Sequence, residues 1–304
     1  MTAPNEQPGT GTGDGSAPDG TVPTYCFRHP DRETYVSCVR CGRHACPDCL
    51  RSAAVGQQCV ECVREGHRGT RAASAVFGGR PSRSAVVTWS LMAINVIAFL
   101  AEIARPGLLY DWGMLGLPAI APGNAVQPGV VEGQWYRLIT SAFTAPGTSL
   151  GGLGLLDIAF NMWALYIVGP SLERLLGPVR FLAVYLLSAV GGGVMFYYLD
   201  AQGFAAGASG AVFGLFGAWF VVSKRLHLDV RGIVTLIAIN LAFGFIVPNI
   251  AWQDHLGGII AGAAITAAYA YAPRKNRALI QVVATLAVVA ILAVAVIIRN
   301  GQLS

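Results

Sequence analysis

The stretch AAGASGAVFGLFGAWF, residues 205–220, is apolar enough to lie in a membrane, yet it carries one serine, Ser209, among four glycines. The rest of the chain has the same character: 54% of its 304 residues are hydrophobic, 12% are charged, and the mean hydropathy is +0.54. A soluble domain carries roughly twice that share of charged residues. We therefore expect an all-α polytopic membrane protein, with this stretch inside one of its spans.

Apolar runs long enough to cross a bilayer recur along the chain. A hydrocarbon core of about 30 Å takes roughly 20 helical residues at about 1.5 Å each. Several of the runs contain Gly, Pro or Asn, which neighbouring helices in a bundle accommodate. The predicted spans are 85–104, 153–170, 180–199, 207–223, 231–248, 254–272 and 278–298.

Lys and Arg residues in the short loops predict the orientation of these spans. Alternate loops are basic, whereas the loops at 200–206 and 249–253 have no Lys or Arg. The basic loops contain Arg174, Arg180, Lys224, Arg225, Arg231, Arg274, Lys275 and Arg277. We expect a multi-pass protein of the cell membrane, with its N-terminus in the cytoplasm and its C-terminus outside. The net charge of +5 comes mostly from the basic residues that indicate this topology, and we expect no nucleic-acid partner.

All seven cysteines lie in the polar part of the chain, between Cys26 and Cys62. Together with one histidine they form four pairs, and the two members of each pair are separated by two residues, a spacing typical of zinc ligands. The pairs are Cys26 and His29, Cys38 and Cys41, Cys46 and Cys49, and Cys59 and Cys62. Eight soft ligands make two tetrahedral sites with no open position, so we expect two structural Zn²⁺ ions and no catalytic one.

The alternative for these cysteines is a set of disulfides, which their odd number and their cytoplasmic location both disfavour. The pattern resembles the B-box-type zinc modules, whose two sites interleave. That resemblance implies that the first pair shares a site with the third, and the second pair with the fourth. His44 or His67 could replace a ligand, although surface positions suit both better. We expect the module to dock or regulate, through a cytoplasmic protein partner.

Polar side chains at membrane depth are energetically expensive and usually functional. Two spans that enter from outside carry Ser209 and His255 near their outer ends, and a third carries Asp157 and Asn161 in its outer half. Three predicted helices therefore bring a hydroxyl, an imidazole and an amide to one level. Asp254 is explained more simply, as a carboxylate at the N-terminal boundary of its helix, where it favours the helix dipole.

Glycines recur at helical spacing in the spans that carry Ser209 and His255. One stripe is Gly210, Gly214 and Gly217, and the other is Gly258 and Gly262 on the face of His255. Faces without side chains let two helix backbones approach closely. Periodicity does not by itself aim Ser209 at His255, because Ser209 lies about 100° from its glycine stripe on an ideal helical wheel. A serine that only satisfies a backbone carbonyl is the alternative.

Three motifs together resemble the rhomboid family of intramembrane serine proteases: GASGAVFG at 207–214, HLGGIIAG at 255–262 and FNMWAL at 160–165. Supporting matches are GPSLERLLG at 169–177 and GQWYRLITSAF at 133–143, which is similar to the family's tryptophan-arginine motif. We expect this last motif to lie in the membrane interface rather than to react. The resemblance implies a six-helix core, with the seventh span as the extra C-terminal helix that some members carry.

The resemblance also assigns roles. Ser209 corresponds to the nucleophile and His255 to the general base that takes its proton. Asn161 corresponds to the oxyanion-hole asparagine, and the backbone N–H of Ser209 is a second candidate donor. Catalysis by such a dyad would need no cofactor.

One position departs from the family pattern. Four residues before Asn161, where the family usually has a histidine, this chain has Asp157. A protonated carboxyl there could donate a hydrogen bond to the oxyanion, so Asp157 is a candidate oxyanion residue, whereas an ionised one would repel it. Alternatively, Asp157 could orient His255 as the carboxylate of a catalytic triad does.

The expected protein is a serine-type endopeptidase that hydrolyses peptide bonds in or near the transmembrane segments of membrane proteins, chiefly single-span ones. The alternative is a proteolytically weak rhomboid-like adaptor that binds transmembrane helices and recruits partners through the zinc module. The expected organisation is a disordered tail at 1–24, a zinc module at 25–66, a basic linker at 67–84, the rhomboid core at 85–272, and a seventh span with a short external tail at 273–304.

Overall fold

The computed structural model describes residues 23–69, 74–82, 84–121, 123–145, 152–247 and 250–304. The chain divides into two compact units, Met1–Ala72 and Ala73–Ser304. Most of the predicted N-terminal tail, and part of the predicted basic linker, lie outside the described residues.

The first unit has little regular structure. Its elements are the 3-10 turn η1 (Pro47–Cys49), the strands β1 (Leu50–Ser52) and β2 (Gln57–Cys59), and the helix α1 (Val60–Gly69). β1 and β2 form an antiparallel hairpin that pairs Leu50 with Cys59. The buried cluster of this unit consists of six cysteines, Ala45 and Leu50. So small an apolar core does not hold a domain together without a further source of stability.

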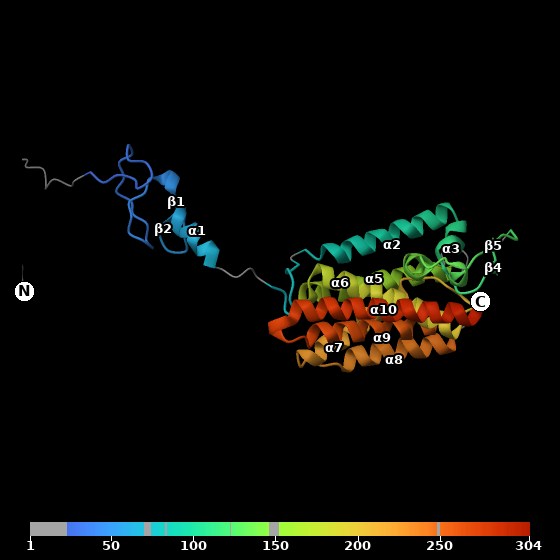
Figure 1. Cartoon of the computed structure of the whole chain (residues 1–304). Helices are drawn as coiled ribbons and strands as arrows, with labels where there is room; N and C mark the ends of the chain where they lie inside the picture. The colour runs from blue at the N-terminus through green and yellow to red at the C-terminus, as the bar shows by residue number, and fades with distance from the viewer. Residues whose placement is uncertain (1–22, 70–73, 83, 122, 146–151, 248–249) are drawn as a thin grey trace, which may run out of the picture. The chain divides into compact units, whose positions relative to one another are not determined.

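The second unit is a helical bundle, and each predicted span coincides with a helix (Figure 1). The helices are α2 (Val86–Ala104), α5 (Gly152–Leu176), α6 (Pro178–Leu199), α7 (Ser209–Arg225), α8 (Arg231–Ile246), α9 (Trp252–Ala270) and α10 (Arg277–Leu303). Four helical segments among the described residues are long and apolar enough to cross a membrane: α2, Gly154–Leu176 within α5, α6, and Arg274–Leu303, which contains α10. The chain is therefore a mostly helical, multi-pass membrane protein.

The other three predicted spans are shorter or more polar. α7 has 17 residues and α8 has 16, and the first turn of α9 carries Gln253, Asp254 and His255. α7 begins two residues later than predicted, because Gly207 and Ala208 belong to the turn that precedes it. Whether these three helices cross the whole bilayer stays a prediction.

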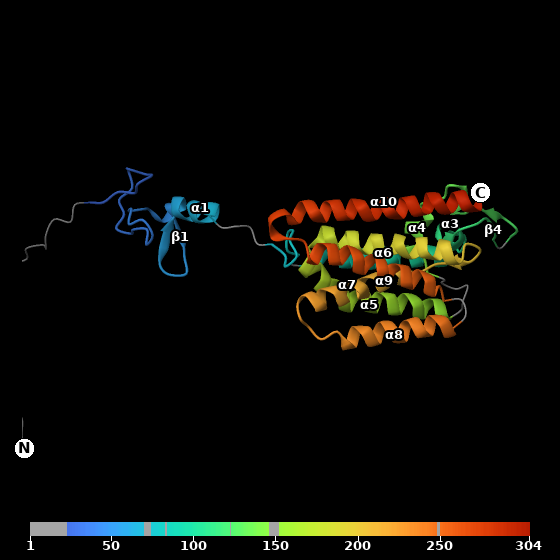
Figure 2. The same cartoon turned by 60° about the horizontal axis from the view of Figure 1, so that its bottom comes forward.

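The centre of the bundle is formed by α6 and α7. Most residues of α7 are buried. In the most apolar window of α6, 61% of the residues are buried, against 11% in the window that contains α10. The core cluster packs residues of α5, α6, α7 and α9 against one another, among them Leu165, Tyr185, Leu215 and Ile265. Figure 2 shows α10 and α8 on opposite sides of this group. Large apolar side chains of α10, such as Leu279, Leu286 and Ile291, remain exposed, as expected of a helix that faces lipid.

The long connection between α2 and α5 forms a folded region at one end of the bundle (Figure 1). Its described elements are α3 (Gly107–Trp112), β3 (Met114–Leu115), β4 (Ala119–Ile120), β5 (Val126–Gln127), η2 (Val130–Glu132), α4 (Arg137–Thr140) and η3 (Ser141–Phe143). β3 pairs with β6 (Phe204–Ala205), which lies just before α7. This pairing ties the connection to the segment that leads into Ser209.

Candidate active site and candidate metal centres

Ser209 is the first residue of α7, and the chain before it is held in place. Leu115 pairs with Phe204 across β3 and β6, and the N–H of Gly207 donates to the carbonyl of Ser141 at 3.0 Å. Gly207 has a φ of +138°, which side-chain-bearing residues rarely adopt. The glycine therefore allows the sharp entry into α7 that places Ser209 at its end.

The length of α7 predicts a depth for Ser209. Lys224 and Arg225 lie in the last turn of this 17-residue helix. At about 1.5 Å per residue the helix is roughly 26 Å long, which is shorter than a hydrocarbon core of about 30 Å. If the basic end lies at one membrane surface, Ser209 would lie a few ångströms inside the other.

The two glycine stripes meet along α7 and α9. A methyl group added to Gly258 would collide with the carbonyl oxygen of Gly210, and one added to Gly262 would collide with that of Gly214. Gly217 continues the seam, since a methyl group there would come within 2.6 Å of the carbonyl oxygen of Ile259. The backbones of α7 and α9 are therefore in direct contact, as the spacing of small residues predicts.

His255 lies at the same end of this seam as Ser209. It is 8% exposed, and its ring stacks on Phe213 with 4.1 Å between ring centroids and 6° between planes. Phe213 is one helical turn after Ser209, so the imidazole faces the first turn of α7. The Nδ1 atom of His255 is buried and has no hydrogen-bond partner, and no hydrogen bond joins His255 to Ser209 in this state.

Asp157 and Asn161 lie one turn apart on α5 and bind each other. The Asn161 Nδ2 atom donates to the Asp157 carbonyl at 3.0 Å and to its Oδ1 at 3.1 Å. The Asp157 Oδ2 atom is buried without a partner. A methyl group added to Gly207 would be 3.4 Å from that oxygen and 3.6 Å from Ser209 Oγ. Asp157 and Ser209 therefore flank the same point, whereas no hydrogen bond links Asp157 to His255 as a triad would require.

A small cavity adjoins the Asn161 amide. Its lining comes from α2, the end of the long connection, α5 and the residue before Ser209: Asn95, Phe143, Thr144, Ala145, Asp157, Ile158, Asn161, Met162 and Ala208. The space open to the centre of a water molecule is about 10 Å³, roughly the room that one water needs. A group the size of one water molecule can therefore fit between α5 and the residue before Ser209.

Arg137 supports this region from inside the fold, and whether its motif lies in the membrane interface stays a prediction. It is fully buried, and its Nη1 atom donates to the carbonyl oxygens of Tyr110 and Gly113 at 2.7 Å each. Trp135, in contrast, is 44% exposed, as an interfacial anchor would be. A guanidinium has five N–H donors and satisfies several loop carbonyls at once, which explains an arginine there.

Sequence reasoning missed Glu173, a fully buried carboxylate of α5. Its Oε2 accepts hydrogen bonds from the backbone N–H and the hydroxyl of Thr88, both at 2.8 Å, and its Oε1 accepts one from Ser82 Oγ at 2.8 Å. It thus caps the N-terminus of α2 from a neighbouring helix. A glutamate just after the predicted span 153–170, among the leucines of GPSLERLLG, was the signal that could have identified it.

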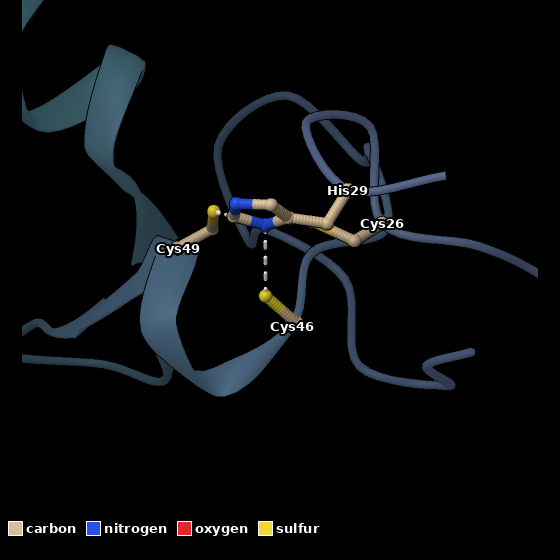
Figure 3. A group of neighbouring side chains, drawn as sticks. All are labelled: Cys26, His29, Cys46 and Cys49. Carbon is tan, nitrogen blue, oxygen red and sulfur yellow. Dashed lines mark hydrogen bonds between the residues drawn. The ribbon is translucent and has the colours of Figure 1, made fainter. Parts of the chain in front are cut away.

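In the first unit, one candidate metal centre combines the first and third sequence pairs. Cys26, His29, Cys46 and Cys49 offer ligand atoms that all lie within 4.8 Å of one another (Figure 3). The His29 Nδ1 atom is 3.4 Å from the Sγ atoms of Cys46 and Cys49 and 3.7 Å from that of Cys26. A tetrahedral zinc with ordinary Zn–S and Zn–N bonds has N···S edges of about 3.6 Å. The cluster therefore has the dimensions of a zinc site.

The other candidate centre combines the second and fourth pairs: Cys38, Cys41, Cys59 and Cys62. The Sγ atoms of Cys41 and Cys59 are 3.8 Å apart, which is about the edge of a tetrahedral zinc–sulfur site. The N–H of Cys59 donates to Cys38 Sγ at 3.2 Å, and Arg43 Nε donates to Cys41 Sγ at 3.5 Å. Such donors hold ligand sulfurs in orientation and stabilise their charge. This interleaved grouping is the one that the B-box resemblance implies.

The thiols of both clusters are crowded together. Burial and the neighbouring thiols raise the pKa of Cys49 to about 11 and that of Cys62 to about 12. Hydrogen bonding from Arg43 has the opposite effect and lowers the pKa of the Cys41 thiol. A bound divalent cation would favour the thiolate form of all of them, because metal ligation deprotonates a thiol.

Of the two histidines left as possible substitutes, His44 does not enter these clusters. His44 is absent from both groups of mutually close ligand atoms, and its Nδ1 is buried without a partner. The His67 side chain lies outside the described residues. All seven cysteines are free thiols, so the first unit contains no disulfide.

Comparison with known proteins bears on the membrane bundle. A family model for the rhomboid domain matches residues 132–272, a range that includes Asn161, Ser209 and His255. The chain is 37% identical over 197 residues to the rhomboid protease GluP of Bacillus subtilis, covering 62% of this chain and 35% of GluP. It is 37% identical over 140 residues to the candidate rhomboid protease YdcA of the same organism, covering 44% of this chain and 67% of YdcA.

A more distant relative is the rhomboid-type serine protease 2 of Emericella nidulans, with 30% identity over 161 residues, 50% of this chain and 30% of that protein. The chain thus spans about a third of the length of GluP and two thirds of that of YdcA. The match to YdcA, the rhomboid-domain match and the helical membrane bundle agree, and the chain belongs to the rhomboid family.

Proposed function

We propose that the protein is an intramembrane serine endopeptidase whose catalytic dyad is Ser209 and His255. The observation that carries the proposal is the arrangement at the start of α7. Ser209 begins the helix, and the His255 ring stacks on Phe213 one turn further along. Asp157 and Asn161 of α5 lie beside the same turn.

The dyad would divide peptide hydrolysis into two steps. As Ser209 Oγ attacks the peptide carbonyl carbon, its proton passes to His255, which then protonates the leaving amine nitrogen. A water molecule then hydrolyses the acyl-enzyme with His255 as base, and the serine is regenerated. Stacking on Phe213 orients the imidazole, a task that a carboxylate performs in a triad. The hydrogen bonds of a catalytic base are often long without substrate and tighten when substrate binds.

The oxyanion formed in each step needs donors that are already in place. The first N–H groups of α7 have no partner within the helix, which makes the Ser209 N–H one candidate donor. The Asn161 Nδ2 atom is the other, and it now donates to two Asp157 oxygens. An oxyanion would compete with Asp157 Oδ1 for one of these hydrogens, so Asp157 sets the availability of the second donor.

We propose that the substrates are transmembrane proteins, chiefly single-span, cut near the outer surface. The basic loops of α5–α6, α7–α8 and α9–α10 lie at the ends of α7 and α9 opposite Ser209 and His255. The positive-inside rule places that basic end, and with it the N-terminus, in the cytoplasm. The dyad then opens toward the outside, where water reaches it, and the C-terminus lies outside.

We further propose that the first unit binds two structural Zn²⁺ ions and docks a cytoplasmic protein. Eight cysteine and histidine ligands fill two tetrahedral sites, so neither ion has a position for substrate. Because the apolar core of this unit is so small, metal binding would supply much of its folding free energy.

One observation favours the alternative function, a proteolytically weak adaptor that binds transmembrane helices. The Asn161 amide is engaged by Asp157, and Ser209 has no hydrogen bond to His255 in this state. An adaptor would keep the helix-binding bundle and recruit partners through the zinc module without needing an assembled dyad.

A fluorophosphonate probe on the full-length protein in detergent separates the two functions. The enzyme is expected to label in the wild type and not in Ser209→Ala, and His255→Ala is expected to label at least a hundredfold more slowly. Cleavage of a model single-span substrate should follow the same order. Absence of labelling in folded wild-type protein that still binds the substrate helix would support the adaptor instead.

A variant that lacks residues 1–70 separates the two units in the same assay. If the zinc module only docks a partner, this variant should label at the wild-type rate. Loss of labelling in a folded bundle would show that the module takes part in the chemistry.

A further inference from the structure

Asp254 lies where α6, α7 and α9 meet, immediately before His255. A methyl group added to Gly192 of α6 would collide with Asp254 Oδ1, and one added to Gly210 of α7 would collide with Asp254 Oδ2. Two glycines on two different helices therefore leave the space that this carboxylate fills. The sequence alone assigns Asp254 only to the boundary of its own helix.

The carboxylate contacts the residue that follows the nucleophile. Its Oδ2 lies against the Cα of Gly210, where a side chain would collide with it. Gly210 belongs to the first turn of α7, where backbone donors lack helical partners and the helix dipole favours negative charge. Asp254 forms no ion pair with a Lys or Arg among the described residues, so this helix end is the positive partner that the structure offers it.

Two adjacent residues of α9 thus hold two successive turns of α7. Asp254 contacts Gly210, and His255 stacks on Phe213. Below them the glycine seam brings the two backbones into contact, and apolar side chains such as Leu215 and Ile265 pack together in the core. At the Ser209 end of the two helices, Asp254 and His255 therefore contribute the contacts of α9 that help to set the register.

We propose that Asp254 is a positioning residue of the active site. It anchors the first turn of α7 to α9, and so fixes the distance and direction from Ser209 Oγ to the His255 ring and the direction of the Ser209 N–H. The inference rests on the proposed protease function and deepens it, because it gives the dyad an orienting carboxylate that acts through the backbone of the nucleophile's helix.

The test measures the second-order rate of fluorophosphonate labelling of the full-length protein in detergent, well below its unfolding temperature. Asp254→Ala removes the anchor and is expected to lower that rate by about tenfold or more, since small displacements of reacting groups have effects of this size. For a model transmembrane substrate, kcat should fall by a similar factor and KM should stay within about twofold. Asp254→Asn keeps the size of the side chain and one of its oxygen acceptors between Gly192 and Gly210, and it is expected to recover most of the rate.

Glu173→Gln is the matched control. It changes a carboxylate that also lies at a helix N-terminus, but at that of α2, and Glu173 is buried and accepts hydrogen bonds from Thr88. It is expected to lower the melting temperature while leaving the labelling rate of the folded protein unchanged. Asp254→Ala protein that melts earlier but labels at the wild-type rate would overturn the inference, because the carboxylate would then be only structural.

If Asp254→Ala does not fold, Gly192→Ala displaces the same carboxylate without replacing it, together with the backbone carbonyl of Asp254. This variant should show the same loss of labelling rate, and a wild-type rate would overturn the inference. Failure of the proposed function gives a different result: wild type and Ser209→Ala would then label equally, which removes the basis for both proposals.

Discussion

The two units of this chain organise their reactive groups in opposite ways. In the first unit six of the eight candidate metal ligands belong to the buried core, so that fold and site are largely made of the same residues. In the membrane bundle the candidate reacting groups are few, and they are positioned by residues with no chemical role, such as Gly207, Gly210 and Gly258. Substitutions should therefore affect the first unit by removing ligands and the bundle by displacing helices.

Removing one metal ligand is expected to have the largest effect. Cys46→Ser deletes a buried thiol that every other ligand of its cluster approaches closely. Structural zinc contributes roughly 10–16 kcal/mol of apparent binding free energy to small zinc domains, so the unit should lose its fold. Elemental analysis should find about two zinc ions per chain in the wild type and one or fewer in the variant, and limited proteolysis should cut the first unit.

The labelling rate of Ser209 should not change in Cys46→Ser, since the bundle has its own core. His44→Ala is the matched control, because His44 lies outside both clusters, and it should keep both ions. If Cys46→Ser keeps two zinc ions, or if its Ser209 is labelled more slowly than in the wild type, the proposed difference between the two units is wrong.

The corresponding change in the bundle is a single methyl group. Gly258→Ala collides with the Gly210 carbonyl and must push α9 away from α7. Overpacking of this kind typically lowers the free energy of unfolding by about 1–3 kcal/mol. We expect a lower melting temperature in detergent together with slower labelling of Ser209, while the zinc content stays unchanged.

Gly232→Ala is the control for Gly258→Ala, because no atom lies within 4 Å of a methyl group added there. It should leave both the melting temperature and the labelling rate close to those of the wild type. If Gly258→Ala has the melting temperature and labelling rate of the wild type, α7 and α9 are packed less closely than in the structure.

The difference between the two units also explains which features could be predicted from the sequence. Ligand spacing in the first unit is a local property, and hydropathy located a helix in each predicted span, since both signals lie within short stretches of chain. The role of Asp254 depends on Gly192 of a different helix, and no local pattern contains that information. Two-residue strands such as β3 and β6 were not predicted, because they are stabilised by pairing with each other across almost 90 residues.

Arg43 gives a smaller and more local test of the first unit. Its guanidinium donates to Cys41 Sγ at 3.5 Å and forms an ion pair with Glu61 at 2.7 Å. Loss of a group that hydrogen-bonds to a ligand typically weakens metal affinity by about 10–100-fold. Because Arg43 is half exposed, we expect Arg43→Ala to weaken zinc affinity by an amount at the lower end of this range. Competition with a chromophoric chelator measures this affinity. Arg51→Ala should have no effect, since Arg51 bonds only to the carbonyls of Asp48 and Leu50.

The smallest effect is expected at Asp157, where the chain departs from the family pattern. Asp157→His should not reduce cleavage of a model transmembrane substrate. The substitution removes Oδ1, one of the two acceptors that now engage the Asn161 amide, and it leaves the backbone acceptor in place. It also removes a carboxylate that would repel an oxyanion when ionised. One Nδ2 hydrogen would then be free for the intermediate, and an imidazole N–H could add a second donor. A tenfold loss of kcat with unchanged KM would show instead that the Asp157 carboxyl has a catalytic role of its own. At this position the bundle would then resemble the first unit, where the loss of one specific side chain has a large effect.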